Sequence, residues 1–365
     1  MLLLGTLAAC AGIGCGAKTG LLVPALERDA AIEAGAVCAR PEVTLSPQAA
    51  EVLFIIDRSN SMADTLDGRD PGPGELSRWL LLQGALAASL AAFDDRLGVG
   101  AEFYPQVLRG EIPPDPDLVC GIDPGIDLPP GPRNSAALLE LMARDEPRGG
   151  TPTAAALLEA ERFFRETPAE GARRFIVLAT DGGPNCNADT GTPGTTCLCT
   201  SSERNDCLDP IFGPYNCIDD RRTLMTLDAL HAGLGIPVYV IGIDNPERPD
   251  LAAVLDRMAE QGGVPRSGSS GRRFYSIQRA GDLDTALATI TESIARCVFR
   301  LALPPTATLL EVRIDGSPIP WRSDHEDGWD RSPIDDREIS LYGSACELAS
   351  APGARVTALF ECAEP

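Results

Sequence analysis

Basic and aromatic residues are scarce in this chain. Lys18 is the only lysine among 365 residues, aromatic residues make up 5%, and the formal net charge is −22. A protein that binds nucleic acid needs a basic face, and one that binds single strands also needs aromatic rings for stacking. The composition therefore predicts no nucleic-acid partner.

Histidine is nearly absent as well. His231 and His325 are the only two histidines, and neither lies in a metal-ligand pattern with a cysteine. Zinc sites and cysteine proteases usually recruit histidine beside cysteine, so neither is indicated. The 12 cysteines are more than a protein of the reducing cytoplasm normally holds, which predicts export to an oxidising compartment.

The N-terminal region has no hydrophobic run long enough to span a membrane. Met1–Ala9 is apolar and uncharged, and Cys10 and Cys15 follow it after small residues. This pattern resembles the end of a lipoprotein signal peptide, where such a cysteine is lipidated. Leu7–Cys10 is the better local match, but cleavage at Cys15 leaves 10 of the 12 cysteines, an even number for disulfides. We predict a signal segment over 1–15, lipidated at Cys15 or alternatively at Cys10, and a flexible tether over 16–48.

An ordinary cleaved signal without lipid is the alternative. Neither Gly16 nor Ala17 is the aspartate that resembles an inner-membrane retention signal, so we expect anchoring in the outer membrane of the cell envelope. The lipid is then the only contact with the membrane. The cysteines that remain as disulfide candidates are Cys38, Cys120, Cys186, Cys197, Cys199, Cys207, Cys217, Cys297, Cys346 and Cys362.

Strand-like and helix-like segments alternate over 49–297. Short apolar, β-branched runs predict strands buried on both faces, at Val52–Ile56, Leu97–Tyr104, Phe175–Ala179, Pro237–Ile243 and Phe274–Ile277. The segments between them predict helices at Leu76–Phe93, Ala136–Met142, Ala154–Phe164, Asp219–Ala232, Leu251–Glu260 and Leu283–Arg296. This alternation predicts an α/β fold, with a doubly wound, mostly parallel sheet flanked by helices.

Two regions depart from the alternation. A Gly/Asn/Thr/Asp-rich insertion over 182–218 holds five cysteines, an odd number that forces at least one bridge outward, and Cys120 is the candidate partner. The remainder, 298–365, predicts a small β-rich module with strands at Glu311–Ile314, Glu338–Leu341 and Val356–Phe360. A disulfide between Cys346 and Cys362 is expected to close it.

Oxygen-bearing residues gather at three junctions of the predicted fold. Asp57-Arg58-Ser59-Asn60-Ser61 follows the first buried strand, Gly149–Thr153 precedes a helix, and Thr180-Asp181-Gly182 follows the strand at Phe175–Ala179. Taken singly, each has a simpler explanation: Thr151 as a helix N-cap, Asp181 as a turn residue, and the two serines as solvated hydroxyls. In parallel sheets, however, ligands bind beyond the carboxyl ends of the strands, where all three junctions meet.

The three motifs together resemble the von Willebrand factor A family, over about 51–297. That resemblance implies a metal-ion-dependent adhesion site formed by Asp57, Ser59, Ser61, Thr151 and Asp181. Hydroxyl and carboxylate oxygens are hard donors suited to Mg²⁺, or to Mn²⁺ or Ca²⁺. The resemblance also implies that an Asp or Glu carboxylate of a protein partner completes the metal shell.

We therefore expect a metal-dependent adhesion module that is not an enzyme and has no small-molecule substrate. No histidine, third carboxylate or recognisable base accompanies the predicted metal ligands, so hydrolysis lacks its usual parts. Two alternatives remain. In one, a structural envelope protein uses the metal only to stabilise loops; in the other, an enzyme uses it as a Lewis acid.

Overall fold

The computed structural model describes most of the chain beyond residue 41. The described residues are 42–48, 50–92, 94, 96–106, 115–168, 172–186, 197–201, 204–243, 248–266, 271–294, 297–301, 309–332, 337–351 and 353–360. The predicted signal segment, most of the predicted tether, and Cys10, Cys15, Cys38 and Cys362 lie outside these residues. Among the described helices, none has the length and apolar character that a membrane span requires.

A six-stranded sheet organises the α/β part of the chain. Its strands are β3 (Ala50–Asp57), β4 (Leu97–Tyr104), β5 (Leu128–Pro132), β6 (Arg173–Thr180), β7 (Val238–Ile243) and β8 (Tyr275–Ile277). They lie in the order β5, β4, β3, β6, β7, β8, and all except β5 run parallel. The strand order reverses between β3 and β6, which is where doubly wound sheets open a crevice.

The antiparallel strand β5 was not among the predicted strands. Its sequence, Leu-Pro-Pro-Gly-Pro, removes backbone donors, and prolines in a strand are tolerated at a sheet edge. The neighbouring strand makes room for it at Gly100, where an added Cβ would lie 2.6 Å from the backbone nitrogen of Pro130. β5 therefore occupies the edge of the sheet, against a strand with no side chain at the closest point.

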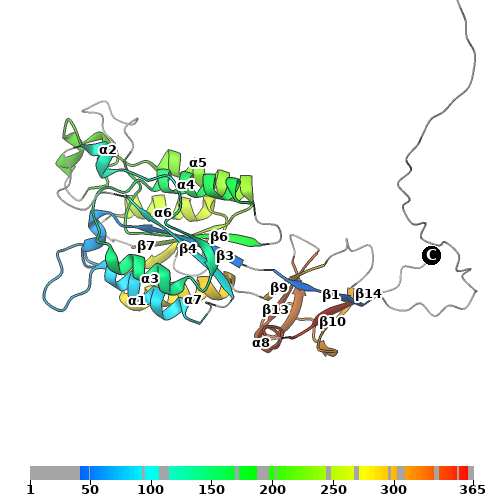
Figure 1. Cartoon of the computed structure of the whole chain (residues 1–365). Coiled ribbons are helices and arrows are strands. Elements are labelled where there is room, and N and C mark those ends of the chain that lie inside the picture. Colours follow the sequence, from blue (N-terminus) through cyan, green and yellow to red (C-terminus); the bar gives the residue numbers. More distant parts are fainter. Residues whose placement is uncertain are drawn as a thin grey trace, which may run out of the picture. The chain divides into compact units, whose positions relative to one another are not determined.

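Helices cover both faces of the sheet (Figure 1). One face carries α1 (Arg78–Leu90), α3 (Ser135–Arg144) and α7 (Ala280–Ile294), and the other carries α4 (Thr153–Glu166), α5 (Asp220–Asp228) and α6 (Pro249–Gln261). A π-helical turn, Ala229–Gly233, continues α5 over the rest of the predicted helix. The architecture is a mixed α/β fold with a largely parallel central sheet. Each predicted helix and strand of this part is present, β4 with the predicted ends and the others with shifted ends.

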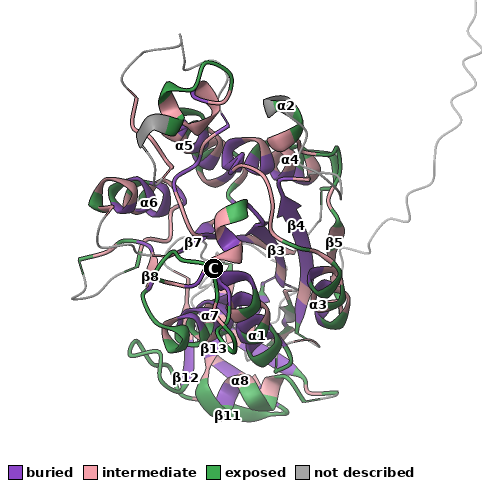
Figure 2. Cartoon of the chain, turned by 90° about the vertical axis from the view of Figure 1, so that its left-hand side faces the viewer, coloured by how far each residue is buried: buried purple, intermediate pink, exposed green. Residues whose placement is uncertain are grey.

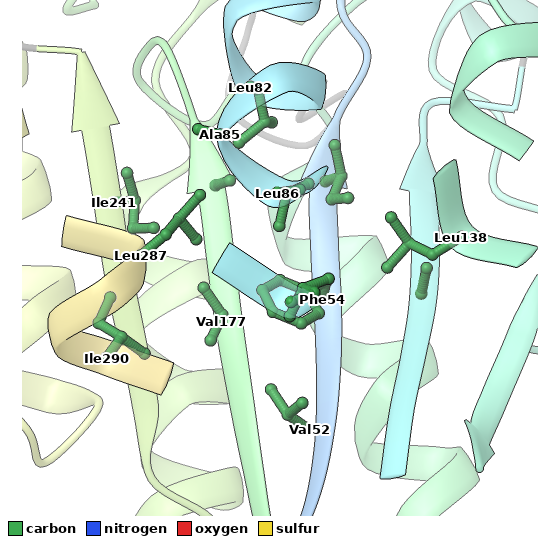
Figure 3. Packing of buried hydrophobic residues seen from close by; sticks show 14 of the residues in the cluster. Val52, Phe54, Leu82, Ala85, Leu86, Leu138, Val177, Ile241, Leu287 and Ile290 are labelled. Carbon is green, nitrogen blue, oxygen red and sulfur yellow. The ribbon is translucent and has the colours of Figure 1, made fainter. Parts of the chain in front are cut away.

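The central strand β3 is buried on both faces. Val52 and Phe54 point into the cluster beneath α1, α3 and α7, whereas Leu53 and Ile55 point into the cluster beneath α4, α5 and α6. All four side chains are 2% exposed or less, and Figure 2 shows the strands of the sheet as the buried centre. Figure 3 shows Phe54 packed among side chains of α1 and the neighbouring strands. Burial of such side chains stabilises a fold by about 2 kcal/mol each.

Two antiparallel four-stranded sheets contain the strands predicted for the β-rich module. The first contains β1 (Glu42–Thr44), β14 (Val356–Phe360), β10 (Leu309–Ile314) and β11 (Ser317–Ile319). The second contains β12 (Gly328–Arg331), β13 (Glu338–Tyr342), β9 (Cys297–Arg300) and β2 (Ser46–Pro47). Apolar side chains of both sheets, including Val312, Trp329 and Ile339, share one buried cluster.

Two short strands and one short helix of this part were not predicted from the sequence. Residues 42–47, assigned from the sequence to the tether, form β1 and β2, which pair with β14 and β9. These strands of three and two residues are too short to show a period, and their partners are more than 250 residues away in the chain. A short helix, α8 (Gly343–Ala349), was also not predicted.

The disulfide predicted for the module is wrong as well. Cys346 of α8 bonds to Cys297 of β9, not to Cys362. β9 pairs with β13, and α8 follows β13 directly, so the two cysteines are brought together by strand pairing. In the described part of the chain every cysteine is bonded, the other pairs being Cys120–Cys186, Cys197–Cys217 and Cys199–Cys207.

Candidate metal site

The candidate site lies at the carboxyl ends of the two central strands. Asp57 is the last residue of β3, and Asp181 directly follows β6. The two strands are paired in parallel, with Ile56 opposite Ala179, so both aspartates leave the sheet at the same edge. This edge is the point where the strand order reverses, and the buried apolar runs of β3 and β6 fix its position.

Asp57 is fully buried and hydrogen-bonded through both carboxylate oxygens. Its Oδ1 accepts from the backbone N–H of Ser59 (2.8 Å), and its Oδ2 accepts from the hydroxyl of Thr180 (2.6 Å). Burial, followed by the nearby Asp181 carboxylate, raises the pKa of Asp57 to about 7. The protein therefore holds a carboxylate here against its preference for water, as sites for cations commonly do.

Ser59, Ser61 and Asp181 form a continuous row of oxygens. The hydroxyls of Ser59 and Ser61 are 3.2 Å apart, and Ser61 donates to Oδ1 of Asp181 (2.9 Å). Ser59 stands before the 3-10 turn η1 (Asn60–Ala63), and Ser61 lies within it, so a single turn presents both hydroxyls. The structure thus brings together four of the five residues assigned from the sequence.

Thr151, the fifth residue, belongs to a loop that is hydrogen-bonded to the same turn. Asn60 N–H donates to the carbonyl of Gly149 (3.0 Å), and Arg148 N–H donates to the carbonyl of Arg58 (2.8 Å). The structure does not support the N-cap explanation, since Pro152 is the N-cap of α4 and no side chain caps that helix. Within the described part of the chain, the Thr151 hydroxyl has no hydrogen-bond partner, so it is available to a ligand.

Asn185 fixes Thr151 from the cysteine-rich insertion. The side-chain Oδ1 of Asn185 accepts from the backbone N–H of Thr151 (2.7 Å), and the backbone N–H of Asn185 donates to the Thr151 carbonyl (2.9 Å). Sequence reasoning missed this residue, because an asparagine in a Gly/Asn/Thr-rich insertion resembles any loop residue. The neighbouring Cys186 ties the insertion to Cys120.

Arg78, at the first position of α1, is a second residue that sequence reasoning missed. Its Nη1 donates to Oδ2 of Asp181 (2.6 Å) and to the carbonyl of Ser61 (3.1 Å). The side chains of this ion pair are 7% and 1% exposed. A cation is therefore already part of the site, in contact with two of the residues assigned as metal ligands.

The donor set fits a hard divalent cation. Two carboxylates and three hydroxyls supply only oxygen, which Mg²⁺, Mn²⁺ and Ca²⁺ prefer, and the Thr151 hydroxyl is uncommitted within the described residues. The hydroxyls of Ser59 and Ser61 bond to each other, and Ser61 also donates to Asp181. Each hydroxyl oxygen has two lone pairs, so both oxygens can also bind a cation. One oxygen of Asp181 is held by Arg78, so this carboxylate is suited to orienting a metal-bound water.

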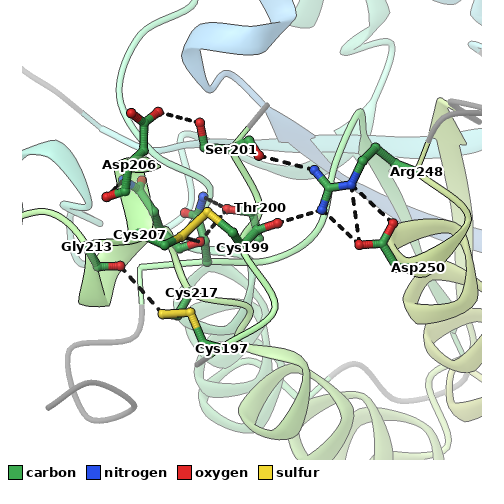
Figure 4. Close-up of a disulfide and its surroundings, with 12 residues drawn as sticks. Cys197, Cys199, Thr200, Ser201, Asp206, Cys207, Gly213, Cys217, Arg248 and Asp250 are labelled. Carbon is green, nitrogen blue, oxygen red and sulfur yellow. Dashed lines mark hydrogen bonds and ion pairs between the residues drawn. A yellow bond between two sulfur atoms is a disulfide. The ribbon is translucent and has the colours of Figure 1, made fainter. Parts of the chain in front are cut away.

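The insertion itself is a disulfide-stabilised segment (Figure 4). Cys199–Cys207 and Cys197–Cys217 lie next to one another, and the guanidinium of Arg248 donates to the carbonyls of Cys199 (2.5 Å) and Ser201 (3.2 Å). The sulfurs of Cys197, Cys207 and Cys217 lie within 4.8 Å of one another. Since each is bonded in a disulfide, none is the thiolate that binds a metal.

The Cys120–Cys186 disulfide packs directly against the loop that carries Thr151. A Cβ added at Gly150 would lie 2.5 Å from Sγ of Cys186 and 3.2 Å from Sγ of Cys120, so only glycine fits there. The odd count of cysteines in the insertion predicted at least one outward bridge, with Cys120 as the candidate partner, and Cys120–Cys186 confirms that pairing. The disulfide and Asn185 together hold Thr151 in place.

Replacement of both Cys120 and Cys186 by serine is expected to weaken divalent-cation binding about tenfold, because Thr151 loses its support. The loss of a bridge spanning 66 residues should also lower the free energy of unfolding by roughly 2–4 kcal/mol. Calorimetric Mn²⁺ titration and thermal melts measure the two effects. The double serine variant of Cys199 and Cys207, whose bridge spans 8 residues, is the control and should bind Mn²⁺ normally. Equal Mn²⁺ affinities in the two variants would contradict this role.

Neither a family model nor a curated protein matches the sequence. Solved structures that align with the chain include the PilB minor pilin from Streptococcus sanguinis (16% identity, TM-score 0.45, 68% of this chain and 62% of that chain). They also include the pilus adhesin SpaC from Lactobacillus rhamnosus GG (14%, 0.46, 86% and 39%). A third is the vWF domain of the type V pili tip protein Mfa5 from Porphyromonas gingivalis (13%, 0.40, 69% and 96%). The chain spans less than two thirds of the PilB and SpaC chains.

Proposed function

We propose that this protein is a metal-dependent adhesion module, which binds a protein partner through a divalent cation. The observation that carries the proposal is the row of oxygens from Ser59 to Asp181, set beside the buried Asp57 carboxylate at the carboxyl edge of the sheet. Ser59, Ser61 and Thr151 would hold the ion through neutral oxygens. Asp57 and Asp181 would orient its waters, or one of them would bind it directly.

The partner offers an Asp or Glu carboxylate in this proposal. Neutral hydroxyls leave most of the cation's charge uncompensated, so the ion attracts an anionic oxygen to complete its shell. When bound, the ion supplies this attraction. The protein's own residues fix the hydroxyls in place and keep the surrounding carboxylates hydrogen-bonded. No group positioned as a base is needed for binding, and we propose no reaction.

The experiment that tests the function combines cation binding with partner capture. Calorimetric titration with Mg²⁺ and Mn²⁺ should show one site, and a pull-down from envelope extract should recover a partner in Mg²⁺ but not in EDTA. The recovered partner should bind directly when purified, and glutamate-to-glutamine or aspartate-to-asparagine replacement at its contact should abolish the complex. The absence of divalent-cation binding would contradict the proposal.

A second candidate function places the contact on the cysteine-rich insertion, with the metal stabilising only the loops. The observation in its favour is the exposure of two large apolar side chains there, Leu208 (63%) and Ile211 (57%). Metal chelation separates the two functions. If the insertion makes the contact, the partner should stay bound in EDTA. Replacement of both Leu208 and Ile211 by serine should then release the partner.

The cell envelope is the proposed location, with lipidation at Cys15 and loss of Cys10 with the signal segment. The paired state of every described cysteine agrees with an oxidising compartment. Intact-mass analysis of the native N-terminus is expected to show a chain that begins at Cys15 and carries acyl groups. A mature chain that begins elsewhere without lipid would contradict the anchor.

A further inference from the structure

Arg78 and Asp181 form a buried ion pair inside the candidate metal site. The guanidinium reaches Asp181 Oδ2 (2.6 Å) and the Ser61 carbonyl (3.1 Å), and a longer contact of 3.5 Å joins it to the Leu66 carbonyl. The Nε–H of Arg78 is also buried and has no acceptor within the described part of the chain. Carboxylate and guanidinium are therefore each other's main compensation for the loss of water.

The guanidinium opposes cation binding and favours anion binding at the same place. It makes the site one charge less negative than the carboxylates of Asp57, Asp181 and the nearby Asp64 would make it alone. A divalent cation that binds beside Asp181 is repelled by this fixed positive charge. Once the cation is bound, the same charge adds to the attraction for an incoming carboxylate.

We propose that Arg78 lowers the affinity of the site for the free cation and strengthens its capture of a carboxylate ligand. This inference rests on the proposed function and names a regulation of that site. Cation and carboxylate then bind cooperatively, each raising the affinity for the other by the same factor. Arg78 is not one of the assigned metal ligands, and its effect on both ligands comes from its charge, which its bonds to Asp181 and the Ser61 carbonyl hold in place.

The direction of the effect distinguishes this role from a structural one. If Arg78 only supported the loop, its replacement would disorder Ser61 and weaken cation binding. If Arg78 opposes the cation by charge, replacement by a neutral residue should tighten cation binding. Glutamine keeps a polar amide while removing the charge, and lysine keeps the charge while losing the planar fork.

The test measures Mn²⁺ affinity from the electron paramagnetic resonance signal of the free ion, with the full chain. Arg78→Gln should bind Mn²⁺ about tenfold more tightly than wild type, and Arg78→Lys should bind as wild type does. Acetate, used as a carboxylate probe, should tighten Mn²⁺ binding more in wild type than in Arg78→Gln. Arg69→Gln is the charge-matched control, since Arg69 pairs with Asp67 and Glu75 at an exposed position of the same loop. It should leave both readouts unchanged.

The outcomes separate the inference from the proposed function. Wild type that binds Mn²⁺, with Arg78→Gln equal or weaker, overturns the role of Arg78 and leaves the metal site standing. Binding by Arg78→Gln but not by wild type supports the role of Arg78 and contradicts the proposed function of the native chain. No binding by either folded protein overturns both. Where thermal melts show that Arg78→Gln is unfolded, Arg78→Lys decides, because a charge-based role requires its Mn²⁺ and acetate responses to match wild type.

Discussion

Asp57→Asn is expected to weaken Mn²⁺ binding by at least about a hundredfold and to leave the fold intact. The substitution removes the negative charge of the most deeply buried oxygen donor of the site. Of the remaining residues, three are neutral hydroxyls, and the Asp181 carboxylate is already paired with Arg78. Too little negative charge then remains to hold a dehydrated divalent cation, so partner capture in Mg²⁺ should be lost as well.

The fold should tolerate this change because asparagine keeps the shape of the side chain. Its amide oxygen can still accept from the Ser59 N–H, and the Thr180 hydroxyl can turn to accept from the amide nitrogen. Removing the charge also relieves the cost of burying a carboxylate close to Asp181, the cause of the raised pKa of Asp57. The melting temperature in EDTA should therefore equal or exceed that of wild type.

Calorimetric titration with Mg²⁺ and Mn²⁺, beside thermal melts in EDTA, tests both statements. Asp67→Asn is the matched control. Asp67 is an exposed carboxylate in the segment between β3 and α1, and it pairs with Arg69. Thr151→Ala should also weaken cation binding, with little loss of stability since Thr151 does not cap α4. Undiminished Mn²⁺ affinity in Asp57→Asn would show that the site does not hold the ion.

The site residues at the ends of strands could be predicted from the sequence. The apolar runs of β3 and β6 appear in the sequence as buried strands, and such strands run parallel when helices separate them. Residues that directly follow them must then emerge at one edge of the sheet. Asp57 and Asp181, separated by more than 120 residues, could therefore be placed together without a structure.

Residues that reach the site from other elements were not predictable in this way. Arg78 contacts Asp181 across 103 residues, and nothing in the local sequence marks it as buried. One signal was available, because a basic residue in the first turn of a helix opposes the helix dipole and needs a carboxylate in compensation. The first turn of α1 holds no acidic residue, so that carboxylate had to come from elsewhere in the fold.

The strand and cysteine pairings of the β-rich module could not be predicted from the sequence either. β1 and β2 are too short to show alternation, and their partners lie at the other end of the chain. An odd count of cysteines predicts that at least one bridge leaves a segment, but it does not say which cysteines meet. The pairing of Cys297 with Cys346 follows from the ladder between β9 and β13, which only the fold reveals.

Glu102→Gln is expected to remove a loss of stability that wild type shows as the pH rises. Glu102 is a fully buried carboxyl on β4, opposite Ile55 of β3, and is not one of the residues assigned to the metal. Burial, followed by the carboxylate of Asp127, raises its pKa to about 9. Its two oxygens accept from the Gln106 side chain (3.2 Å) and from the N–H of Asp127 (3.2 Å), which offset only part of the cost.

The direction of the pH effect follows from where the proton is held. In the unfolded chain Glu102 loses its proton near pH 4.5, whereas in the folded protein it keeps the proton up to about pH 9. Between these values the folded state binds more protons than the unfolded state, so the free energy of unfolding falls as the pH rises. One pKa unit corresponds to about 1.4 kcal/mol, and the fall attributable to this group should therefore reach several kcal/mol.

Glutamine mimics the protonated carboxyl in shape and charge, so Glu102→Gln should match wild type at pH 5 and exceed it increasingly toward pH 9. Urea unfolding of both proteins at intervals between these pH values measures the difference, in EDTA so that cation binding does not contribute. Glu140→Gln, at an exposed position of α3 paired with Arg144, is the control and should follow the wild-type pH profile. If the free energies of unfolding of Glu102→Gln and wild type differ by the same amount at all pH values, the pKa of Glu102 is the same in the folded and unfolded states. Its burial would then be compensated by groups other than Gln106 and Asp127.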